Sequence, residues 1–412
     1  MRIAVVGAGS SGLLAAVLLQ RQGHQVTLLE RADRPRTEGC GILLVGAGVQ
    51  ALAEAGIPAL ADRLIASGEV VQRFHVRNLQ GRTINVSDAG YGPGDPPALL
   101  IRRAAILELL WSAFDPASFC GGASVEACLP TPGEPSGPVT LQFADGGRWS
   151  GDLVIAADGI FSRLAAAVAP ERRLHYLGDR VWRGVVPDPE GFCGRGDFFV
   201  YARGRGIYAN FFQLGPDADG VLQTHWGFFQ EEPLPQERPR QRQLLTEPVP
   251  AEALARLDPA AAALIRSTPA DQVVANWSFD IDPLPRLHRG RLALIGDAAH
   301  AMSSSQARGM TAGLGDAVAL ARALELHRDD PARALAAYDE ERRPIVHGFQ
   351  QRSREVSQKI GRRQSVPAQP PASTADRPSS ETPAAGTPAA ETPSAETPAA
   401  LAGPAAPVAA AR

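Results

Sequence analysis

The sequence contains almost no lysine: of its 41 basic residues, Lys359 is the only lysine and all others are arginine. A Walker A phosphate site, a Schiff-base nucleophile and a lysine general base each need that side chain. Its absence from the chain before Lys359 therefore disfavours P-loop nucleotide hydrolysis and pyridoxal-phosphate chemistry. Codon usage is the simplest explanation for the excess of arginine.

The sequence also lacks a charge excess, a cysteine pattern and a long apolar run. Its 41 basic residues are balanced by 44 acidic ones, so we expect no nucleic-acid partner. The four cysteines form no C-x-x-C pair, so we expect neither a zinc site nor disulfides, and a reduced compartment. Glycines interrupt the apolar N-terminal run, which argues against a secretory signal, and no stretch approaches the roughly 20 apolar residues of a membrane span. We therefore expect a soluble cytoplasmic protein.

Composition changes abruptly near Gly361. Beyond it the chain consists mainly of Pro, Ala, Ser, Thr and Glu, with Thr-Pro repeated from Thr382 to Thr397. Such a segment has too little apolar surface to offset the entropy that is lost on ordering. We predict a disordered tail over 364–412. Before it we predict a helix over 331–360 that Pro344 can interrupt, with 346–363 as the C-terminal helix.

The body of the chain has an α/β pattern. An apolar run over 2–6, helical spacing over 12–22 and a second apolar run over 25–30 predict a βαβ unit. Between 176 and 279, aromatic and β-branched residues alternate with turn residues, which predicts an antiparallel-type sheet. Other predicted elements are helices over 101–114 and 311–326, and strands over 139–143, 149–156 and 291–295.

We therefore expect a Rossmann-like lobe that is interrupted by a β-rich substrate lobe. The first lobe is expected over 1–70, 101–175 and 281–345, and the second over 71–100 and 176–280.

A glycine motif lies between the first predicted strand and helix. Gly7, Gly9 and Gly12 match G-x-G-x-x-G. The first glycine permits a tight turn, the second lets a pyrophosphate approach the backbone, and the third allows close helix–strand packing. Glu30 ends the second strand, where an acid accepts ribose hydroxyls. The combination predicts a dinucleotide site without separating NAD from FAD.

A second candidate site follows the predicted strand over 291–295. The carboxylate of Asp297, after Gly296, can accept a polyol hydroxyl, and a helix start at 309–311 can donate N–H groups to an electron-rich ring edge. His300 has no second ligand at metal-binding spacing, so we expect no metal. Ser303–Ser305 lack a G-x-S-x-G elbow, which disfavours a hydrolase.

Three segments in this order resemble the group A flavoprotein monooxygenases, the family of p-hydroxybenzoate hydroxylase and salicylate hydroxylase. They are the glycine motif with Glu30, the pair Asp158-Gly159, and Gly296-Asp297-Ala-Ala-His300. Segments around Cys40-Gly41, Arg102-Arg103 and Trp182-Arg183-Gly184 also resemble the family. The resemblance runs from residue 1 to about residue 349 and implies a p-hydroxybenzoate hydroxylase-like fold.

The resemblance also implies an FAD site. Asp158 would serve both FAD and the reduced nicotinamide, Asp297 would bind the ribityl chain, and the backbone at 309–311 would face the flavin pyrimidine. The ADP half would lie on the glycine motif and Glu30, with the backbone of Val125 along the adenine. The residues that the resemblance assigns to the cofactor are Gly7, Gly9, Ser11, Gly12, Glu30, Arg31, Arg36, Gly41, Arg103, Val125, Asp158, Asp297, Gly309, Met310 and Thr311.

The sequence departs from the family beside the expected flavin ring. Ser304 replaces the usual proline, Ala307-Arg308-Gly309 replaces Gly-Gln-Gly, and Thr311 replaces asparagine. Arg308 can either stabilise negative charge on reduced flavin or point to solvent or an ion pair, and both readings stay open. The lost proline leaves the shape of the oxygen-reaction pocket open.

The activity that the resemblance implies is oxygen insertion. NADH or NADPH would reduce FAD, O2 would form a flavin C4a-hydroperoxide, and one oxygen atom would pass to an aromatic or conjugated small molecule by hydroxylation or epoxidation. Alternatives are a related flavin reductase or halogenase, although the Trp-x-Trp-x-Ile-Pro signature is absent, and a flavin-binding protein without productive oxygen transfer.

Arg183 is our candidate substrate-side residue, because it lies in the Trp-Arg-Gly segment. Strand alternation places His225 and Trp226 on opposite faces, so at most one of them faces the pocket. The other candidates on the substrate lobe are Tyr201, Arg203, Tyr208 and Asn210.

Overall fold

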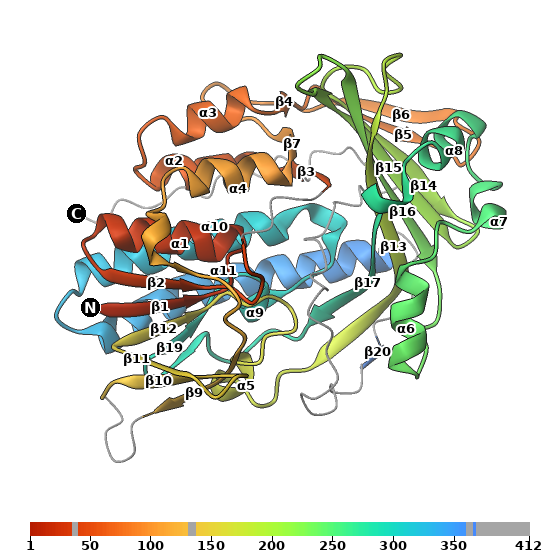
Figure 1. The fold of residues 1–412 in the computed structure, drawn as a ribbon. Helices are drawn as coiled ribbons and strands as arrows, with labels where there is room; N and C mark the ends of the chain where they lie inside the picture. Colours follow the sequence, from red (N-terminus) through yellow and green to blue (C-terminus); the bar gives the residue numbers. More distant parts are fainter. Residues whose placement is uncertain (35–39, 131–136, 360–365, 368–412) are drawn as a thin grey trace.

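A mainly parallel sheet forms the centre of the first lobe (Figure 1). The computed structural model describes residues 1–34, 40–130, 137–359 and 366–367. The strand order is β18-β19-β12-β1-β2-β8, and only the β18–β19 pair is antiparallel. The strands are β1 (Arg2–Val6), β2 (Gln25–Leu29), β8 (Phe119–Cys120), β12 (Leu153–Ala156), β18 (His288–Arg289) and β19 (Leu292–Leu294).

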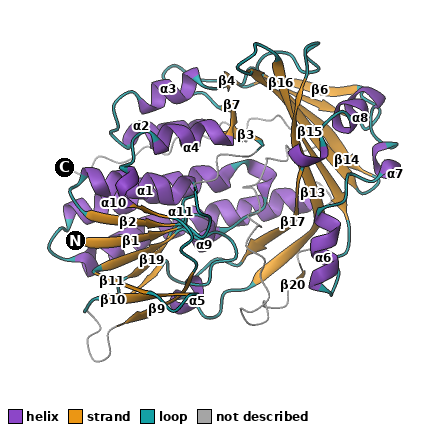
Figure 2. Ribbon diagram, in the orientation of Figure 1, coloured by secondary structure: helices purple, strands orange, loops and turns teal. Residues whose placement is uncertain are grey.

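Helices and two small sheets surround this sheet. α1 and α10 pack together along one face, and α11 packs on α10 (Figure 2). The helices are α1 (Ser10–Arg21), α2 (Gly46–Glu54), α3 (Leu60–Ala66), α4 (Arg103–Trp111), α5 (Ala165–Val168), α9 (Asp297–His300), α10 (Arg308–Leu326) and α11 (Pro331–Lys359), with 3-10 turns η1 (Pro116–Ser118) and η3 (Ser304–Gln306). The small sheets contain β9 (Val125–Pro130), β10 (Val139–Phe143) and β11 (Arg148–Gly151), and β3 (Gly41–Leu44), β7 (Leu99–Arg102) and β4 (Glu69–Val70).

The second lobe is a large sheet of order β17-β13-β16-β15-β14-β5-β6. Its pairs are antiparallel except β5 with β14, which are parallel. The strands are β5 (Arg73–Arg77), β6 (Thr83–Asp88), β13 (Leu174–Pro187), β14 (Asp197–Gly204), β15 (Ile207–Pro216), β16 (Leu222–Glu231) and β17 (Val274–Ile281). Its outer face carries the short elements α6 (Arg238–Leu245), α7 (Ala251–Leu254), α8 (Pro259–Arg266) and η2 (Ala270–Gln272) (Figure 1).

The α/β fold with an interrupting β-rich lobe confirms the expected fold class, but several elements differ. Ile101 and Arg102, expected at the start of a helix over 101–114, instead end the strand β7, which is paired on both sides by β3 and β4. The single strand expected over 149–156 is two strands of different sheets. The chain turns between them at Asp152, whose carboxylate accepts a 2.7 Å hydrogen bond from the backbone N–H of Arg2.

The helix predicted over 331–360 is confirmed as α11, and it is not broken at Pro344. α11 runs without interruption through Pro344, so the boundary expected between 345 and 346 lies inside one helix. Buried side chains on both sides of Pro344 join α11 to neighbouring strands: the Tyr338 hydroxyl donates to the Leu294 carbonyl of β19, and Gln350 donates to the Ile281 carbonyl of β17. Within the expected tail, β20 (Val366–Pro367) pairs with β13, and the rest of that tail lies outside the described residues.

Candidate functional site

The three motif segments found in the sequence converge at the carboxyl ends of the parallel strands. β19, β12, β1 and β2 are adjacent, and their carboxyl ends lead into Asp297, Asp158, Gly7 and Glu30 respectively. Ligands of such sheets bind in the crevice outside the carboxyl ends of the strands. The convergence, which sequence spacing alone could not establish, makes this edge the candidate site.

The three glycines of the first motif have different surroundings. Gly7 has a φ of +107°, and a Cβ there would overlap the Ala157 carbonyl oxygen. A Cβ on Gly12 would overlap the carbonyl oxygen of Gly7 and lie 3.0 Å from the Ala157 Cβ. Nothing lies within 4 Å of a Cβ on Gly9, at the start of α1. Gly7 and Gly12 are thus required by the fold, whereas Gly9 borders open space.

Glu30 is fixed at the end of β2 by two backbone amides. Its Oε2 accepts from the Ala8 N–H at 2.9 Å and its Oε1 from the Ala32 N–H at 3.1 Å. A carboxylate offers about four acceptor positions, so two remain for other donors. The contact with Ala8 joins the acid to the glycine turn, as a dinucleotide site requires.

Two carboxylates face the same arginine beside this turn. Asp158 accepts from the Arg163 N–H at 3.0 Å through Oδ2, while its Oδ1 is shielded and has no hydrogen-bond partner among the described residues. Burial raises the pKa of both Asp158 and Asp297. Burial lowers the pKa of Arg172 to about 10, against the opposing effect of these two carboxylates. Arg172 also donates to the Ile160 carbonyl at 2.5 Å.

A buried network supports the turn that carries Asp297. Asp316 of α10 accepts from the Gly296 N–H at 2.9 Å, contacts His300 Nε2 at 2.5 Å and pairs with Arg342 of α11 at 2.9 Å. Burial alone would raise the pKa of Asp316, but His300 and Arg342 lower it to about 2. His300, considered above as a metal ligand, therefore contacts a carboxylate of the protein.

The second site also packs closely on the first. A Cβ on Gly296 would lie 2.8 Å from the Ser11 Oγ, and one on Gly313 of α10 would overlap that atom. Ser11 is therefore enclosed between the two motifs. Gly309 faces the Asp297 carboxylate, since its Cβ would lie 3.8 Å from Oδ1.

Gly309, Met310 and Thr311 form the first turn of α10, which begins three residues earlier than the predicted helix over 311–326. Met310 is half-buried against the core of the first lobe. The Thr311 hydroxyl is shielded and has no partner among the described residues.

The remaining predicted cofactor residues within the described part of the chain lie on β3, α4, β9 and the loop after β2. Gly41 lies at the start of β3, paired with Arg102, and the Arg103 N–H donates to the Cys40 carbonyl at 3.1 Å. Val125 begins β9, two residues after Ala123, whose N–H donates to the Glu30 carbonyl at 2.8 Å. Arg31 is exposed just after Glu30. Arg36 lies outside the described residues.

The inner face of the large sheet carries a cluster of aromatic side chains, which we call the inner aromatic cluster. Leu43, Leu100 and Ala307 pack against it from the first lobe and from the loop before α10. Phe198 stacks on Phe212 with ring centroids 5.4 Å apart. The cluster consists of Phe74, Phe198, Tyr208, Phe212 and Phe229, all buried.

Three buried polar side chains share this inner face. Arg183 and Asn210 flank Gly227 across three neighbouring strands, and the Asn210 amide lies over the glycine, since a Cβ there would be 3.0 Å from Asn210 Oδ1. Arg183 donates to the Asn276 Oδ1 at 2.5 Å, and its guanidinium lies 5.9 Å from the Phe229 ring. His225 on the next row accepts from the Gly41 N–H at 3.1 Å.

Other sequence candidates lie away from this face. Trp226 packs against the outer helices and its Nε1 donates to Thr268 at 2.8 Å, which confirms that it faces opposite to His225. Tyr201 belongs to the same outer core and its hydroxyl donates to Asp258. Arg203 is paired with Asp179 and Glu231.

The residues that depart from the family form the loop before α10. Ser304 begins the turn η3, and Ala307 has the left-handed φ of +54° that glycine would adopt freely. The Arg308 guanidinium lies 5.5 Å from the Phe349 ring, and burial lowers the pKa of Arg308. Arg308 thus packs on α11, which is neither of the two roles considered for it from the sequence.

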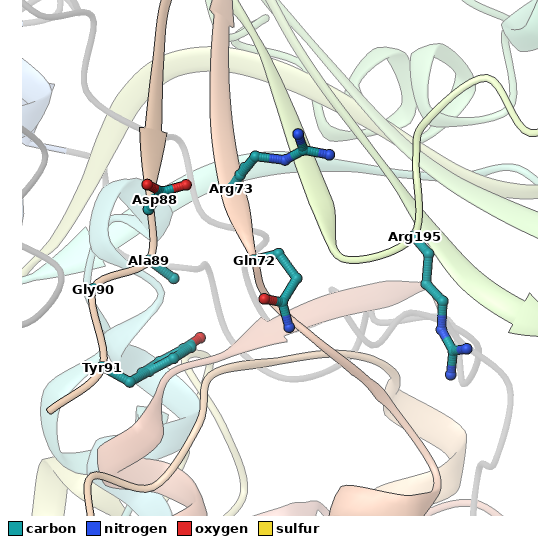
Figure 3. A pocket seen from close by; sticks show the side chains of 7 residues that line it. All are labelled: Gln72, Arg73, Asp88, Ala89, Gly90, Tyr91 and Arg195. Carbon is teal, nitrogen blue, oxygen red and sulfur yellow. The ribbon is translucent and has the colours of Figure 1, made fainter. Parts of the chain in front are cut away.

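A separate open cavity of about 410 Å³ lies on the second lobe (Figure 3). Its two arginines are already paired, Arg73 with Asp197 at 2.9 Å and Arg195 with Glu69 at 2.6 Å. None of the predicted cofactor residues lines it. The other lining residues are Gln72, Asp88, Ala89, Gly90 and Tyr91.

Comparison with known proteins decides the family. Residues 1–353 match the family described as FAD binding domain. An aurachin C monooxygenase/isomerase of Stigmatella aurantiaca is 30% identical, over 82% of this chain and 84% of the relative. An FAD-dependent urate hydroxylase of Klebsiella pneumoniae is 31% identical, over 83% of this chain and 86% of the relative. The chain belongs to the FAD-dependent monooxygenases.

A solved structure agrees with this family. Klebsiella pneumoniae HpxO complexed with FAD and uric acid aligns with a TM-score of 0.72 and 26% identity, covering 87% of this chain and 88% of that chain. The resemblance stated from the motifs, the expected fold class and FAD as cofactor are thereby confirmed. NADH or NADPH is the usual co-substrate of the family. Within the described part of this monooxygenase, no helix is long and apolar enough to cross a membrane.

The residues of this monooxygenase fit FAD on observations of its own structure. Gly9 leaves open space at the start of α1, and neither α1 nor α10 has a side-chain cap, so their first N–H groups are available. Asp158 keeps a shielded carboxylate oxygen without a partner among the described residues. These are the donors and acceptors that a diphosphate, a ribityl chain and a flavin ring edge require.

Sequence reasoning missed three residues of this arrangement. Arg172 belongs to no motif, and only the packing of the loop after Asp158 brings it to the two carboxylates. Asp316 of α10 accepts a hydrogen bond from the Gly296 N–H, and Arg342 of α11 pairs with Asp316. Asp316 carried one weak signal, a lone acid in an otherwise apolar helical stretch.

Proposed function

We propose that this monooxygenase inserts one oxygen atom from O2 into a planar aromatic or conjugated small molecule. The observation that carries the proposal is the inner aromatic cluster. It faces the first lobe and the loop before α10, and its packing includes Ala307 of that loop. Flat rings gain dispersion and stacking energy from such a surface, while its few polar groups fix their orientation. Hydroxylation and epoxidation both fit this surface.

The proposed cofactor contacts follow from the motifs. Backbone N–H groups after Gly9 bind the diphosphate, Glu30 binds the adenosine ribose, and Asp297 binds the ribityl chain, with Val125 along the adenine. The first turn of α10, at Gly309, Met310 and Thr311, would hold the flavin pyrimidine. When bound, FAD supplies the redox chemistry that activates O2, for which protein side chains have no equivalent.

The remaining proposed cofactor contacts are three arginines, two small residues that line the site and one carboxylate. Arg31, Arg36 and Arg103 neutralise phosphate charge, Ser11 and Gly41 line the site, and Asp158 serves both FAD and the reduced nicotinamide. The shielded oxygen of Asp158 and the position of Arg103 beside Cys40 support this assignment.

Arg183 is the proposed substrate-side residue. Its charge persists at any working pH, and it lies on the inner face beside the aromatic cluster. A cation there stabilises negative charge that develops on the substrate as the ring or alkene is attacked. Asn276 holds the guanidinium through its Oδ1.

The chemistry balances with NADH or NADPH as reductant: substrate, O2, NAD(P)H and a proton give oxygenated product, water and NAD(P)⁺. We also propose a cytoplasmic location, supported by four cysteines that are all free thiols.

The test is a panel of phenols, aromatic acids, quinolones and polyketides. Each is incubated with the purified holoenzyme and NADH or NADPH, and reductant loss, peroxide and product mass are recorded. Stimulated oxidation with an oxygenated product supports the proposal. Stimulated oxidation that yields only peroxide for every ligand supports a flavin-binding protein without productive oxygen transfer.

A further inference from the structure

A hydrogen bond joins the two lobes at the candidate site. The backbone N–H of Gly41, at the start of β3, donates to Nδ1 of His225 in β16 at 3.1 Å. Both residues are buried, and 184 positions of sequence separate them. Sequence inspection shows His225 only as an alternating strand residue, whereas the structure gives it a partner in the other lobe.

The bond fixes the protonation of the imidazole. Because Nδ1 accepts, the ring proton of neutral His225 resides on Nε2. Burial lowers the pKa of His225 well below 6.5, and the cations Arg183 and Arg102 lower it further, while the Gly184 carbonyl opposes them. A protonated ring would direct an N–H toward the Gly41 N–H. His225 therefore stays neutral, and the bond persists across the working pH range.

The Gly41 backbone also packs directly against two side chains of the large sheet, with no space for a side chain of its own. A Cβ on Gly41 would lie 2.8 Å from the Cβ of His225 and 2.7 Å from a ring carbon of Phe212. The imidazole lies 4.5 Å from the Phe212 ring, centroid to centroid. Phe212 belongs to the inner aromatic cluster, so the same imidazole contacts the proposed substrate surface.

The opposite side of this segment is held by the first lobe. The Arg103 N–H donates to the Cys40 carbonyl at 3.1 Å, and Gly41 pairs with Arg102. The backbone of Cys40 and Gly41 is thus held between the start of α4 and His225. Gly41 and Arg103 are both proposed cofactor contacts, so the position of this backbone determines the shape of the flavin side of the site.

We propose that His225 is a positioning residue that holds the Cys40–Gly41 backbone against the large sheet through its Nδ1 acceptor. It thereby sets the spacing between the flavin-binding segment and the inner aromatic cluster. The inference rests on the proposed function in one respect, the assignment of Gly41 to the FAD site.

The test compares three substitutions that differ in where they place an acceptor. His225→Asn keeps an acceptor near the position of Nδ1, His225→Gln moves it outward to the position of Nε2, and His225→Leu removes it. FAD affinity is measured on each apoprotein by quenching of flavin fluorescence. In the Leu and Gln variants the Gly41 N–H loses its buried acceptor, so we expect these variants to bind FAD about 5- to 30-fold more weakly than the original protein. The Asn variant keeps the acceptor and should bind FAD within about twofold of the original protein.

A second histidine supplies the matched control. His75 lies on β5 of the same sheet and pairs with Asp197 at 3.2 Å, away from Gly41. His75→Leu should leave the FAD dissociation constant unchanged. Thermal unfolding of each apoprotein checks that it is folded, and if the Leu variant is not, the comparison of Asn with Gln decides.

Three results would overturn the inference. Equal FAD affinity in all three His225 variants and the original protein would show that the bond does not act on the site. Equal weakening in Asn, Gln and Leu would show that the ring acts by packing alone. Failure of the unaltered protein to bind FAD would instead overturn the proposed function, and the inference with it.

Discussion

The different surroundings of Gly9 and Gly12 predict opposite consequences for the same substitution. A Cβ at Gly12 meets backbone and Ala157, so Gly12→Ala forces α1 away from β1. Overpacking of this kind costs about 1–3 kcal/mol, and the value here should lie at the upper end because the main overlap is with backbone. A Cβ at Gly9 meets nothing within 4 Å, and the φ of −73° there suits alanine.

Gly9→Ala should therefore leave the free energy of unfolding unchanged or raise it by about 0.4–1 kcal/mol, because alanine lowers the conformational entropy of the unfolded chain. It should weaken FAD binding, because the new methyl group occupies the space through which the diphosphate approaches the backbone. Loss of one charge-assisted hydrogen bond, about 1.5–3 kcal/mol, corresponds to roughly 10- to 150-fold.

Urea unfolding of the apoproteins and a fluorescence titration with FAD measure the two effects separately. A Gly9→Ala apoprotein that is several kcal/mol less stable would contradict the open space at this position. A Gly9→Ala protein that binds FAD as tightly as the original would contradict the assignment of the diphosphate to this turn.

Three further predictions concern the second motif and its supports. Asp297→Ala should purify with little or no FAD, and a full yellow flavin complement would show that the ribityl assignment is wrong. Arg172→Gln should weaken FAD binding about tenfold, because Asp158 and Asp297 lose a shared cation, whereas Arg173→Gln, at the exposed neighbouring position, should have no effect in the same titration. Asp316→Asn should lower the free energy of unfolding by about 3–5 kcal/mol in urea, because Arg342 is left buried without its carboxylate. The pKa of Asp316 is depressed from 3.8 to about 2, so its stabilisation is present above pH 3.8 and lost as the pH falls through about 2. In acid unfolding, the Asp316→Asn variant should lack the loss of stability that protonation of Asp316 causes in the original protein. Identical acid unfolding of the two proteins would contradict the buried network.

The elements that the sequence predicted well are those with a strong local signal. The βαβ opening, the glycine turn and Glu30 follow from spacing and from the steric demands of Gly7 and Gly12. Strand alternation correctly separated His225 from Trp226, because each pleat reverses the side-chain direction. The family motifs then indicated the order of the remaining segments.

The errors came from features that depend on tertiary packing. Ile101 and Arg102 were predicted to begin a helix, but pairing on both sides by β3 and β4 makes them the end of a strand. Pro344 lies inside α11 without ending it, and residues on both sides of it are anchored by buried contacts to other elements. Arg172, Asp316 and the partner of His225 lie far from the motifs in sequence, and only the folded chain brings them to the site.

The central claim is that oxygen from O2 is transferred to an aromatic or conjugated substrate in this site. The most direct measurement is the mass of the product formed by the FAD-loaded protein under ¹⁸O2, with NADH or NADPH and a ligand that stimulates reductant oxidation. The account predicts one ¹⁸O atom in each product molecule. Product oxygen that comes from labelled water instead of O2 would contradict it.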